Sequence, residues 1–159
     1  MTFVDVFTVA LFGHREIDDL RRLEKKLIPV IENLIRTKSF VSFWIGRHGE
    51  FDEFAASVIK SVQRKTGAEN SELVLVLPYT IAHLSDYENY YDQILIPECI
   101  YGLHPKAIIT AKNQYMIDQC DLAVFYVERT FGGAYAAMKY AKKKNKETLN
   151  LFYDDLVQD

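Results

Sequence analysis

Five of the seven glycines in this chain of 159 residues stand where a short apolar segment gives way to a helical pattern. They form three corners, which contain Gly13, then Gly46 with Gly49, then Gly132 with Gly133. If the apolar segments are parallel strands, their carboxyl ends meet at one crevice, where backbone amides and helix N-termini can approach an anion. The spacing therefore predicts a crevice that binds a phosphate-bearing metabolite, with a nucleotide as the first expectation.

The third corner directly follows an apolar segment and opens a helical pattern. Paired glycines there leave several backbone amides free to hold phosphate oxygens at the positive end of a helix dipole. The alternative is that the pair makes a tight turn and lets helix and strand pack closely. Neither GxGxxG nor GxxxxGK[ST] occurs in the chain, so a dinucleotide or P-loop site of those types is not supported. The candidate ligand contacts in this corner are Thr130, Gly132, Gly133 and Ala134.

The first corner combines Gly13 with two polar side chains, His14 and Arg15. An arginine at this place can pair with a phosphate or carboxylate through two parallel hydrogen bonds. A histidine can donate a hydrogen bond or titrate near neutral pH. The alternative is a simple helix-start turn in which the arginine pairs with Glu16 or Asp18.

The second corner places two carboxylates beside two glycines. Asp52 either contacts a ligand or caps the following helix by accepting hydrogen bonds from its first amides. Glu50 is less easily explained by capping and could accept a hydrogen bond from a ribose hydroxyl. Together with Gly46, Arg47 and Gly49, both acids are candidate ligand contacts.

Two polar residues lie on the predicted helix that precedes the fourth strand. Asn113 is a candidate ligand contact, since it could reach the crevice from this helix. Lys112 could do the same, but a solvated helix face explains it equally well.

Apolar segments and helical patterns alternate along the chain. Strands are predicted at 8–12, 40–45, 72–77, 122–127 and 148–152, and helices at 18–34, 52–65, 108–119 and 133–144. Pro29 predicts a kink, or two abutting helices that divide near Ile28. Residues 79–106 carry five of the ten tyrosines and form a long excursion, with a short strand or turn near 94–97, that packs either over the crevice or on the sheet edge. The pattern predicts an α/β fold with a mostly parallel sheet of about five strands and helices on both faces.

Composition limits the class of protein. The length fits a single domain over residues 1–159, with 49% hydrophobic residues for its core. The longest apolar runs are too short to span a membrane and no charged start precedes an apolar core, so we expect a cytoplasmic protein without membrane partners. Two cysteines, Cys99 and Cys120, are expected to be reduced, semi-buried packing residues. We expect no metal and no cofactor.

Charge argues against nucleic acid as a partner. The net charge is −3, whereas non-specific duplex binding depends on clustered positive charge. The lysine-rich run 142–146 falls in the last turn of a predicted helix, where cations complement the dipole, and no aromatic residue interrupts it. It is therefore interpreted as a helix end.

Taken together, the corners resemble the small bacterial members of the SLOG superfamily, which includes the DNA-processing DprA proteins and the Lonely Guy phosphoribohydrolases. The resemblance covers nearly the whole chain and rests on ALFGHRE, FWIGRHGEFDEFA, LVLVLPY, AKNQYMIDQCDLAVFYV and FGGAYAAMKYAKKKNKETLNLF. In this order the motifs resemble the small uncharacterised SLOG proteins of Gram-positive bacteria and their mobile elements. The resemblance implies a Rossmann-like three-layer sandwich and a nucleotide-derived ligand held by Gly13, Arg15, Gly46, Gly49, Asn113, Gly132 and Gly133.

One departure from the family bears on catalysis. Lonely Guy enzymes carry a PGGxGTxxE signature whose glutamate helps to cleave an N-glycosidic bond, whereas TFGGAYAAMK has no acid after its glycines. The leading hypothesis is therefore a non-catalytic sensor of a small nucleotide-derived molecule, such as an ADP-ribose-like or cyclic nucleotide signal. The alternative is a nucleotide N-glycoside hydrolase or transferase that uses Glu50 or Asp52. A third is an interaction protein that acts through the tyrosine-rich excursion. The oligomeric state is open, and the exposed helix faces permit a homodimer.

Overall fold

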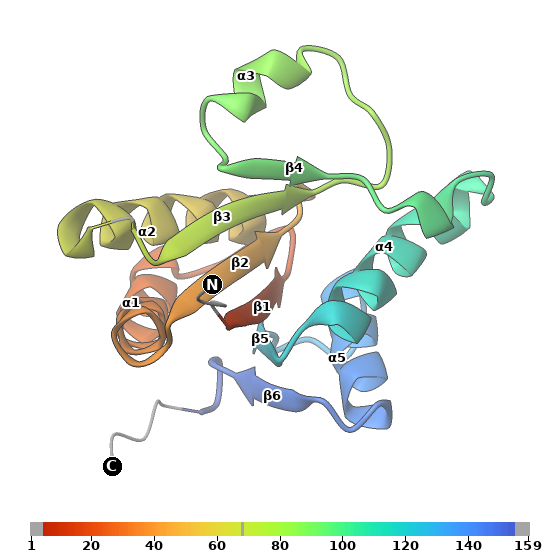
Figure 1. Ribbon diagram of the computed structural model, residues 1–159. Coiled ribbons are helices and arrows are strands. Elements are labelled where there is room, and N and C mark those ends of the chain that lie inside the picture. Colours follow the sequence, from red (N-terminus) through yellow and green to blue (C-terminus); the bar gives the residue numbers. More distant parts are fainter. Residues whose placement is uncertain (1–4, 68, 155–159) are drawn as a thin grey trace.

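The computed structural model describes residues 5–67 and 69–154. Its centre is a six-stranded sheet with the order β4-β3-β2-β1-β5-β6, in which every neighbouring pair is parallel (Figure 1). The strands are β1 (Val6–Gly13), β2 (Phe40–Ile45), β3 (Ser71–Val76), β4 (Gln93–Leu95), β5 (Leu122–Tyr126) and β6 (Glu147–Asn150).

Helices cover both faces of the sheet. They are α1 (Leu20–Thr37), α2 (Glu50–Thr66), α3 (Leu84–Glu88), α4 (Pro105–Gln119) and α5 (Gly133–Lys143), with a short 3₁₀ helix η1 at Glu98–Ile100. Helices α1 and α2 pack on one face around Phe43 and Leu75, and α4 and α5 pack on the other around Phe125 and Met116. The prediction of a Rossmann-like α/β sandwich with a mostly parallel sheet is confirmed.

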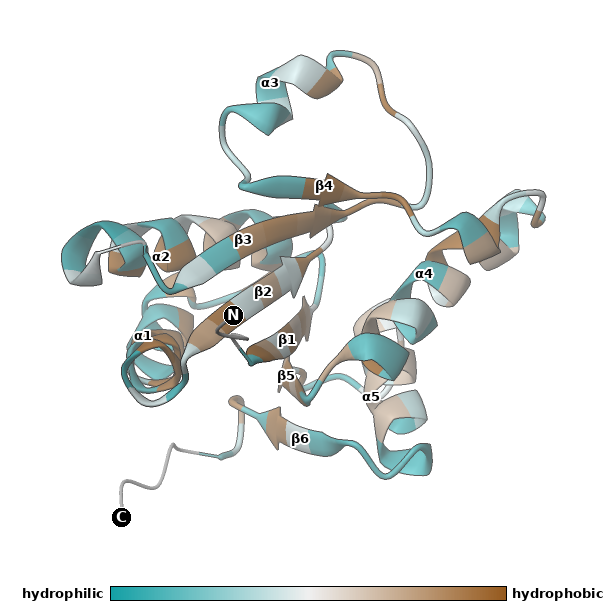
Figure 2. Cartoon of the chain, in the orientation of Figure 1, coloured by the Kyte–Doolittle hydropathy of each residue, from teal (hydrophilic) through white to brown (hydrophobic). Residues whose placement is uncertain are grey.

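The strands are apolar because both of their faces are covered, as Figure 2 shows for the brown segments of the sheet. All five residues of β5 are buried, and so are Val9 to Phe12 in β1. None of the described helices is long and apolar enough to cross a membrane.

The chain changes direction across the sheet between β1 and β5. From β1 it moves outward through β2, β3 and β4, and α4 then returns it to β5 on the other side of β1. A change of this kind opens a crevice outside the carboxyl ends of the two strands, where open α/β sheets bind their ligands. The topology therefore puts the first and third glycine corners side by side.

The sheet has one strand more than the predicted number of about five. The extra strand, β4, lies inside the tyrosine-rich excursion and pairs with β3 from Val74 to Val76. Only three residues take part, which is too short a run for alternation of apolar and polar residues to identify it. The excursion thus builds one edge of the sheet and carries α3 above it (Figure 1).

Helix α1 runs without a break across Pro29, contrary to the predicted division near Ile28. Leu27 on one side of the proline and Val30 and Ile31 on the other are all buried against the sheet. This apolar contact on both sides offsets the backbone hydrogen bond that proline removes. At the start of the helix, the Asp19 carboxylate accepts a hydrogen bond from the Arg22 amide at 3.1 Å.

The cysteines differ from the expectation that both are semi-buried. Cys99 is exposed, because it lies in η1 at the rim of the sheet, whereas Cys120 is buried. The Cys120 thiol donates to the Ile117 carbonyl at 3.2 Å, and burial raises the pKa of this thiol to about 11. Cys120 is therefore a packing residue in its thiol form.

Candidate nucleic-acid interface

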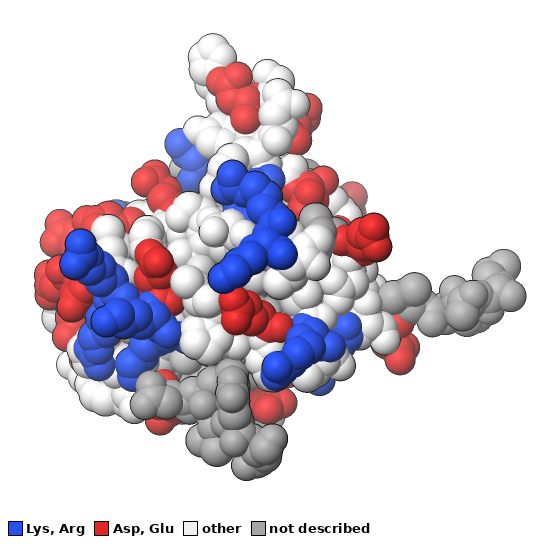
Figure 3. Space-filling model, turned by 90° about the vertical axis from the view of Figure 1, so that its left-hand side faces the viewer, with Lys and Arg blue, Asp and Glu red and all other residues white. Residues whose placement is uncertain are grey.

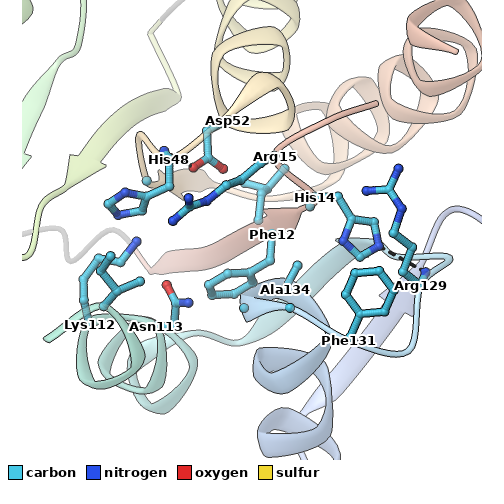
Figure 4. Close-up of a pocket in the computed structure, with 16 residues that line it drawn as sticks. Phe12, His14, Arg15, His48, Asp52, Lys112, Asn113, Arg129, Phe131 and Ala134 are labelled. Atoms are coloured by element: carbon cyan, nitrogen blue, oxygen red, sulfur yellow. Dashed lines mark hydrogen bonds between the residues drawn. The ribbon is translucent and has the colours of Figure 1, made fainter. Parts of the chain in front are cut away.

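A cavity of about 330 Å³ opens at the carboxyl ends of β1, β2 and β5. Its walls come from residues 11–15, from the corner after β2, from α4 and from the segment 129–134 that leads into α5. Figure 4 shows Lys112 and Asn113 reaching into it from α4, with Arg15 and His48 on the opposite side and Phe131 beside the start of α5. The cavity is thus built where the three glycine corners converge.

Most of the residues proposed from the sequence line this cavity. They are Gly13, His14, Arg15, Gly46, Asp52, Asn113, Gly132, Gly133 and Ala134. The others, Arg47, Gly49, Glu50 and Thr130, lie in the same corners but outside the lining. Arg47 points elsewhere, since its guanidinium carbon lies 4.5 Å above the centre of the Tyr87 ring in α3.

Lys112 is the cation at the floor of the cavity. Its side chain is only 2% exposed. From the sequence, a solvated helix face explained Lys112 as well as a place in the crevice did, and this burial rules out the solvated face. Burial lowers the pKa of its ammonium to about 8, although the negative charge of Asp52 acts in the opposite direction. Within the described part of the chain the ammonium has no hydrogen-bond acceptor or ion pair within 4.0 Å. The side chain is therefore buried, whereas its ammonium faces the cavity without a hydrogen-bond partner among the described residues.

One of the two sequence interpretations made Asp52 the N-cap of α2. The structure contradicts it, because the N-cap is Gly49. The helix begins at Glu50 after Gly49, and Asp52 lies in its first turn. Its Oδ2 accepts a hydrogen bond from the His48 amide at 2.8 Å, which ties the corner to the helix. Burial raises the pKa of this carboxyl, whereas Lys112 lowers it.

His48 was not among the residues proposed from the sequence. Burial, and then the charges of Lys112, Arg15 and Arg47, lower the pKa of its imidazole to about 4, so the ring is neutral at pH 7. Its Nε2 is buried without a hydrogen-bond partner among the described residues, and the same holds for Oδ1 of Asn113. Two polar atoms of the cavity are thus unsatisfied in the protein alone.

We expect acidification to destabilise the protein through His48. The pKa of this ring falls from 6.5 to about 4 on folding, so the unfolded chain binds the proton more tightly between these values. The free energy of unfolding should therefore decrease as the pH falls from 6.5 towards 4. A His48→Gln variant should show a smaller decrease in denaturant titrations over this range. Asp52 contributes to this pH dependence in the unmodified protein and in His48→Gln alike. If the free energy of unfolding changed with pH identically in the two proteins, the assignment of the decrease to His48 would be wrong.

Gly46 allows the cluster to form. A Cβ at Gly46 would lie 2.6 Å from the Lys112 ammonium and 3.2 Å from Oδ2 of Asp52. A larger residue would displace the Lys112 ammonium, so the glycine lets the charges of α4 and α2 approach the end of β2.

His14, which lines the cavity, holds the third corner through one of its two ring nitrogens. Its Nε2 accepts hydrogen bonds from the amides of Glu128 and Arg129 at 3.3 and 3.2 Å. Burial, followed by the charge of Arg129, lowers the pKa of the ring, which suits a neutral acceptor. This contact fixes the segment between β5 and α5.

The third corner presents backbone amides and an aromatic ring. Gly132 has φ of +93°, a conformation that favours glycine, and no side chain caps α5. Since Ala136 donates to the Gly132 carbonyl, the amides in the first turn before it have no partner within the helix. Phe131 is 67% exposed at the rim of the cavity, and the sequence analysis did not single it out.

The site therefore combines three groups that suit one kind of ligand. Lys112, Arg15 and the amides at the start of α5 can hold an anion. His48 and Asn113 offer unsatisfied polar atoms to a hydrogen-bonding group, and Phe131 offers a flat ring. Phosphate, a hydrogen-bonding edge and an aromatic face occur together in nucleotides.

Comparison with known proteins places the fold. No protein-family model matches the chain, and no curated protein matches it. Among solved structures it is similar to DNA processing protein A (DprA) of Streptococcus pneumoniae, with a TM-score of 0.64 and 16% identity over 89% of this chain. It is also similar to DprA of Helicobacter pylori, with a TM-score of 0.60 and 14% identity over 89% of this chain. The chain spans 49% and 63% of the lengths of these two proteins.

The comparison corrects two expectations from the sequence. The Helicobacter pylori protein was studied for its single-stranded DNA binding mode, so a protein of this fold binds a polymer of nucleotides. A small nucleotide-derived signal as the ligand, and the exclusion of nucleic acid as a partner, are both contradicted. Overall charge was a poor guide because the cavity itself is lined by three cations, Arg15, Lys112 and Arg129, and one acid, Asp52.

The hydrolase alternative is not favoured either. Glu50 is exposed outside the cavity, and Asp52 is engaged by a backbone amide. The chain has a Rossmann-like α/β fold that is similar to the fold of the two DprA structures.

Proposed function

We propose that this chain is a single domain that binds single-stranded DNA at the cavity between the glycine corners. The observation that carries the proposal is the Lys112 ammonium, which is buried in the cavity without a hydrogen-bond acceptor among the described residues. A buried ammonium of this kind is stabilised when an anion enters. The DNA backbone supplies such an anion at every nucleotide.

Phosphate contacts and stacking have separate places in this site. A phosphodiester pairs with Lys112 and Arg15 and accepts hydrogen bonds from the free amides at the start of α5. A base stacks on the exposed Phe131 ring and turns its edge toward Asn113. One nucleotide of the strand thereby uses the cations, the free amides, the aromatic ring and Asn113.

A single strand fits the charge distribution better than a duplex does. Bases of a single strand have free faces that can stack on an aromatic side chain, whereas duplex binding needs a broad positive surface. Figure 3 shows a face of the molecule on which basic and acidic groups are mixed. The cavity, in contrast, is lined by Arg15, Lys112 and Arg129 with one acid, Asp52, so it carries net positive charge.

The proposal includes two finer expectations from the sequence. The motifs resemble the small SLOG proteins of Gram-positive bacteria and their mobile elements. The cytoplasmic location fits a protein that meets single-stranded DNA inside the cell.

The test is a fluorescence anisotropy titration with a labelled oligothymidylate of about 12 nucleotides, a length within the range of known single-strand sites. We expect binding at least ~10-fold tighter than to a duplex of the same length. Affinity should fall with salt, by a slope of about −0.7 for each phosphate contacted. Phe131→Leu should weaken binding, because leucine keeps an apolar side chain but cannot stack. Equal affinity for single strand and duplex, or no binding, would contradict the proposal.

A further inference from the structure

His14 uses one of its two ring nitrogens within the protein and leaves the other without a partner. Nε2 accepts hydrogen bonds from the amides of Glu128 and Arg129, whereas Nδ1 has no hydrogen-bond partner among the described residues. A neutral imidazole carries its proton on the nitrogen that does not accept, so these two bonds fix the tautomer with hydrogen on Nδ1. The ring therefore has one N–H donor that the described part of the protein does not use.

The unused donor belongs to the wall of the cavity. His14 lines the cavity together with Arg15, which follows it in the chain, and with the first residues of α5. In Figure 4 the dashed hydrogen bonds leave the ring toward Arg129, and the second ring nitrogen lies on the other side of the ring, toward Ala134. The Nδ1–H group is thus directed to the part of the cavity where Arg15 and the amides of α5 can hold an anion.

A second proton on the ring would disturb the third corner. This proton occupies Nε2, and an N–H group there cannot accept from the amides of Glu128 and Arg129 but faces them with the same polarity. The segment that holds these amides leads to Phe131 and to the start of α5. The shape of the corner, and with it the place of its ligand groups, therefore depends on a neutral ring.

Charged and titratable side chains face this ring from two hollows, because His14 lines the cavity and also a smaller hollow of about 150 Å³. Those of the cavity are Arg15, His48, Asp52, Lys112 and Arg129, and those of the smaller hollow are Glu16, Asp18, Asp19, Arg22, Tyr126 and Glu128. Burial and then the charge of Arg129 lower the pKa of His14, although Glu128 acts in the opposite direction. The net effect of these neighbours favours the neutral form.

We propose that His14 donates a hydrogen bond from Nδ1 to a phosphate of single-stranded DNA while Nε2 holds the third corner, so that binding requires the neutral ring. This inference rests on the proposed function and adds to it a ligand contact and a dependence on pH. Its sign is opposite to that of simple charge attraction, in which a histidine cation binds a polyanion more strongly than a neutral ring does. Affinity should therefore fall when His14 is protonated.

Two substitutions of His14 separate its two roles. In His14→Gln the side-chain oxygen can take the place of Nε2 and accept from both amides, but no donor stands at the place of Nδ1 and the side chain does not titrate. His14→Leu removes the acceptor and the donor together. The matched control is His104→Asn: His104 accepts from the Lys106 amide at 3.2 Å at the start of α4, outside the cavity lining, and asparagine is favoured at such a position.

Each variant is first shown to be folded by circular dichroism, and binding is measured by anisotropy with an oligothymidylate of about 12 nucleotides. At neutral pH we expect His14→Gln to bind about 10- to 100-fold more weakly than the unmodified protein, the range for a hydrogen bond to a charged group, and to unfold at the same urea concentration. His14→Leu should bind more weakly still and unfold at a lower concentration. His104→Asn should match the unmodified protein.

Nitrogen-15 NMR of the His14 ring gives a readout that does not depend on DNA. The ring should carry its proton on Nδ1 at neutral pH, and its titration locates the pKa of His14. The affinity of the unmodified protein and of His104→Asn should decrease through this pKa, and that of His14→Gln should not. Asp52, whose carboxyl pKa is raised by burial, is present in all of these proteins, so the comparison isolates His14.

Three results would overturn this inference while DNA binding itself stands. They are equal affinity of His14→Gln and the unmodified protein, a neutral ring with its proton on Nε2, and an affinity that does not fall through the pKa of His14. Failure of the unmodified protein to bind the oligomer at any pH would overturn the proposed function and this inference together.

Discussion

Replacing Lys112 with methionine is expected to weaken binding of single-stranded DNA by about 10- to 100-fold. Hydrogen bonds to charged groups contribute roughly 1.5–3 kcal/mol, and this ammonium is buried in the cavity where the phosphate is proposed to lie. Methionine keeps the length and the apolar stem, so the variant should remain folded. The measurement is the same anisotropy titration with an oligothymidylate of about 12 nucleotides.

Lys143→Met is the matched control, because it removes the same charge from the last turn of α5 at the opposite end of the strands. We expect its affinity to equal that of the unmodified protein. A pH series gives a second readout. Binding should weaken as the pH rises above about 8, because the Lys112 ammonium of the unbound protein loses its proton there. The Lys112→Met variant should not show this decrease. If Lys143→Met lost more affinity than Lys112→Met, the site would lie at the basic helix end instead.

The sequence predicted the fold well because the strands are buried on both faces. Continuous apolar segments at 40–45 and 122–127 ended at the observed strand ends within a residue, and glycines marked the turns after β1, β2 and β5. For residues 94–97 the sequence left a short strand and a turn as alternatives, because so few residues carry no periodicity, and the structure has a strand there, β4 at Gln93–Leu95. The division of the helix expected at Pro29 is absent from α1. The sequence could not show the buried contacts on either side of the proline that hold the helix together.

The glycine corners could be located from the sequence, but the groups between them could not. Lys112 lies on a helix whose polar and apolar residues are mixed, so no pattern told a buried face from a solvated one. Its burial depends on the close approach of α4 to Gly46, a tertiary contact. Phe131 resembled an ordinary turn residue until its exposure beside the cavity was seen.

The ligand class was missed for a related reason. A net charge of −3 describes the whole chain, whereas recognition depends on the field inside one cavity. The acids that make the chain negative include Glu16, Asp18, Asp19 and Glu128, which line a separate, smaller hollow together with Arg22. These acids lie outside the cavity lining, so the net charge of the chain does not describe the cavity.

Gly49 joins the first two corners through a contact too close for any other residue. A Cβ at this position would lie 2.4 Å from the Cα of Arg15 and 2.8 Å from its Cβ. The Glu50 amide next to it donates a hydrogen bond to the Arg15 carbonyl at 2.8 Å. Because the obstructing atoms belong to the backbone of the β1 corner, no rotation of a side chain can relieve the clash.

We therefore expect Gly49→Ala to lower the free energy of unfolding by about 1–3 kcal/mol, the usual cost of an inserted group that displaces backbone. The displacement moves Arg15 away from the cavity, so binding of single-stranded DNA should also weaken. Gly133→Ala is the stability control, since its Cβ would meet nothing closer than Nδ2 of Asn113 at 4.0 Å, and its stability should be unchanged or slightly increased. Urea titrations of the three proteins decide the matter. Equal midpoints for Gly49→Ala and Gly133→Ala would show that the two corners are not held together by this contact.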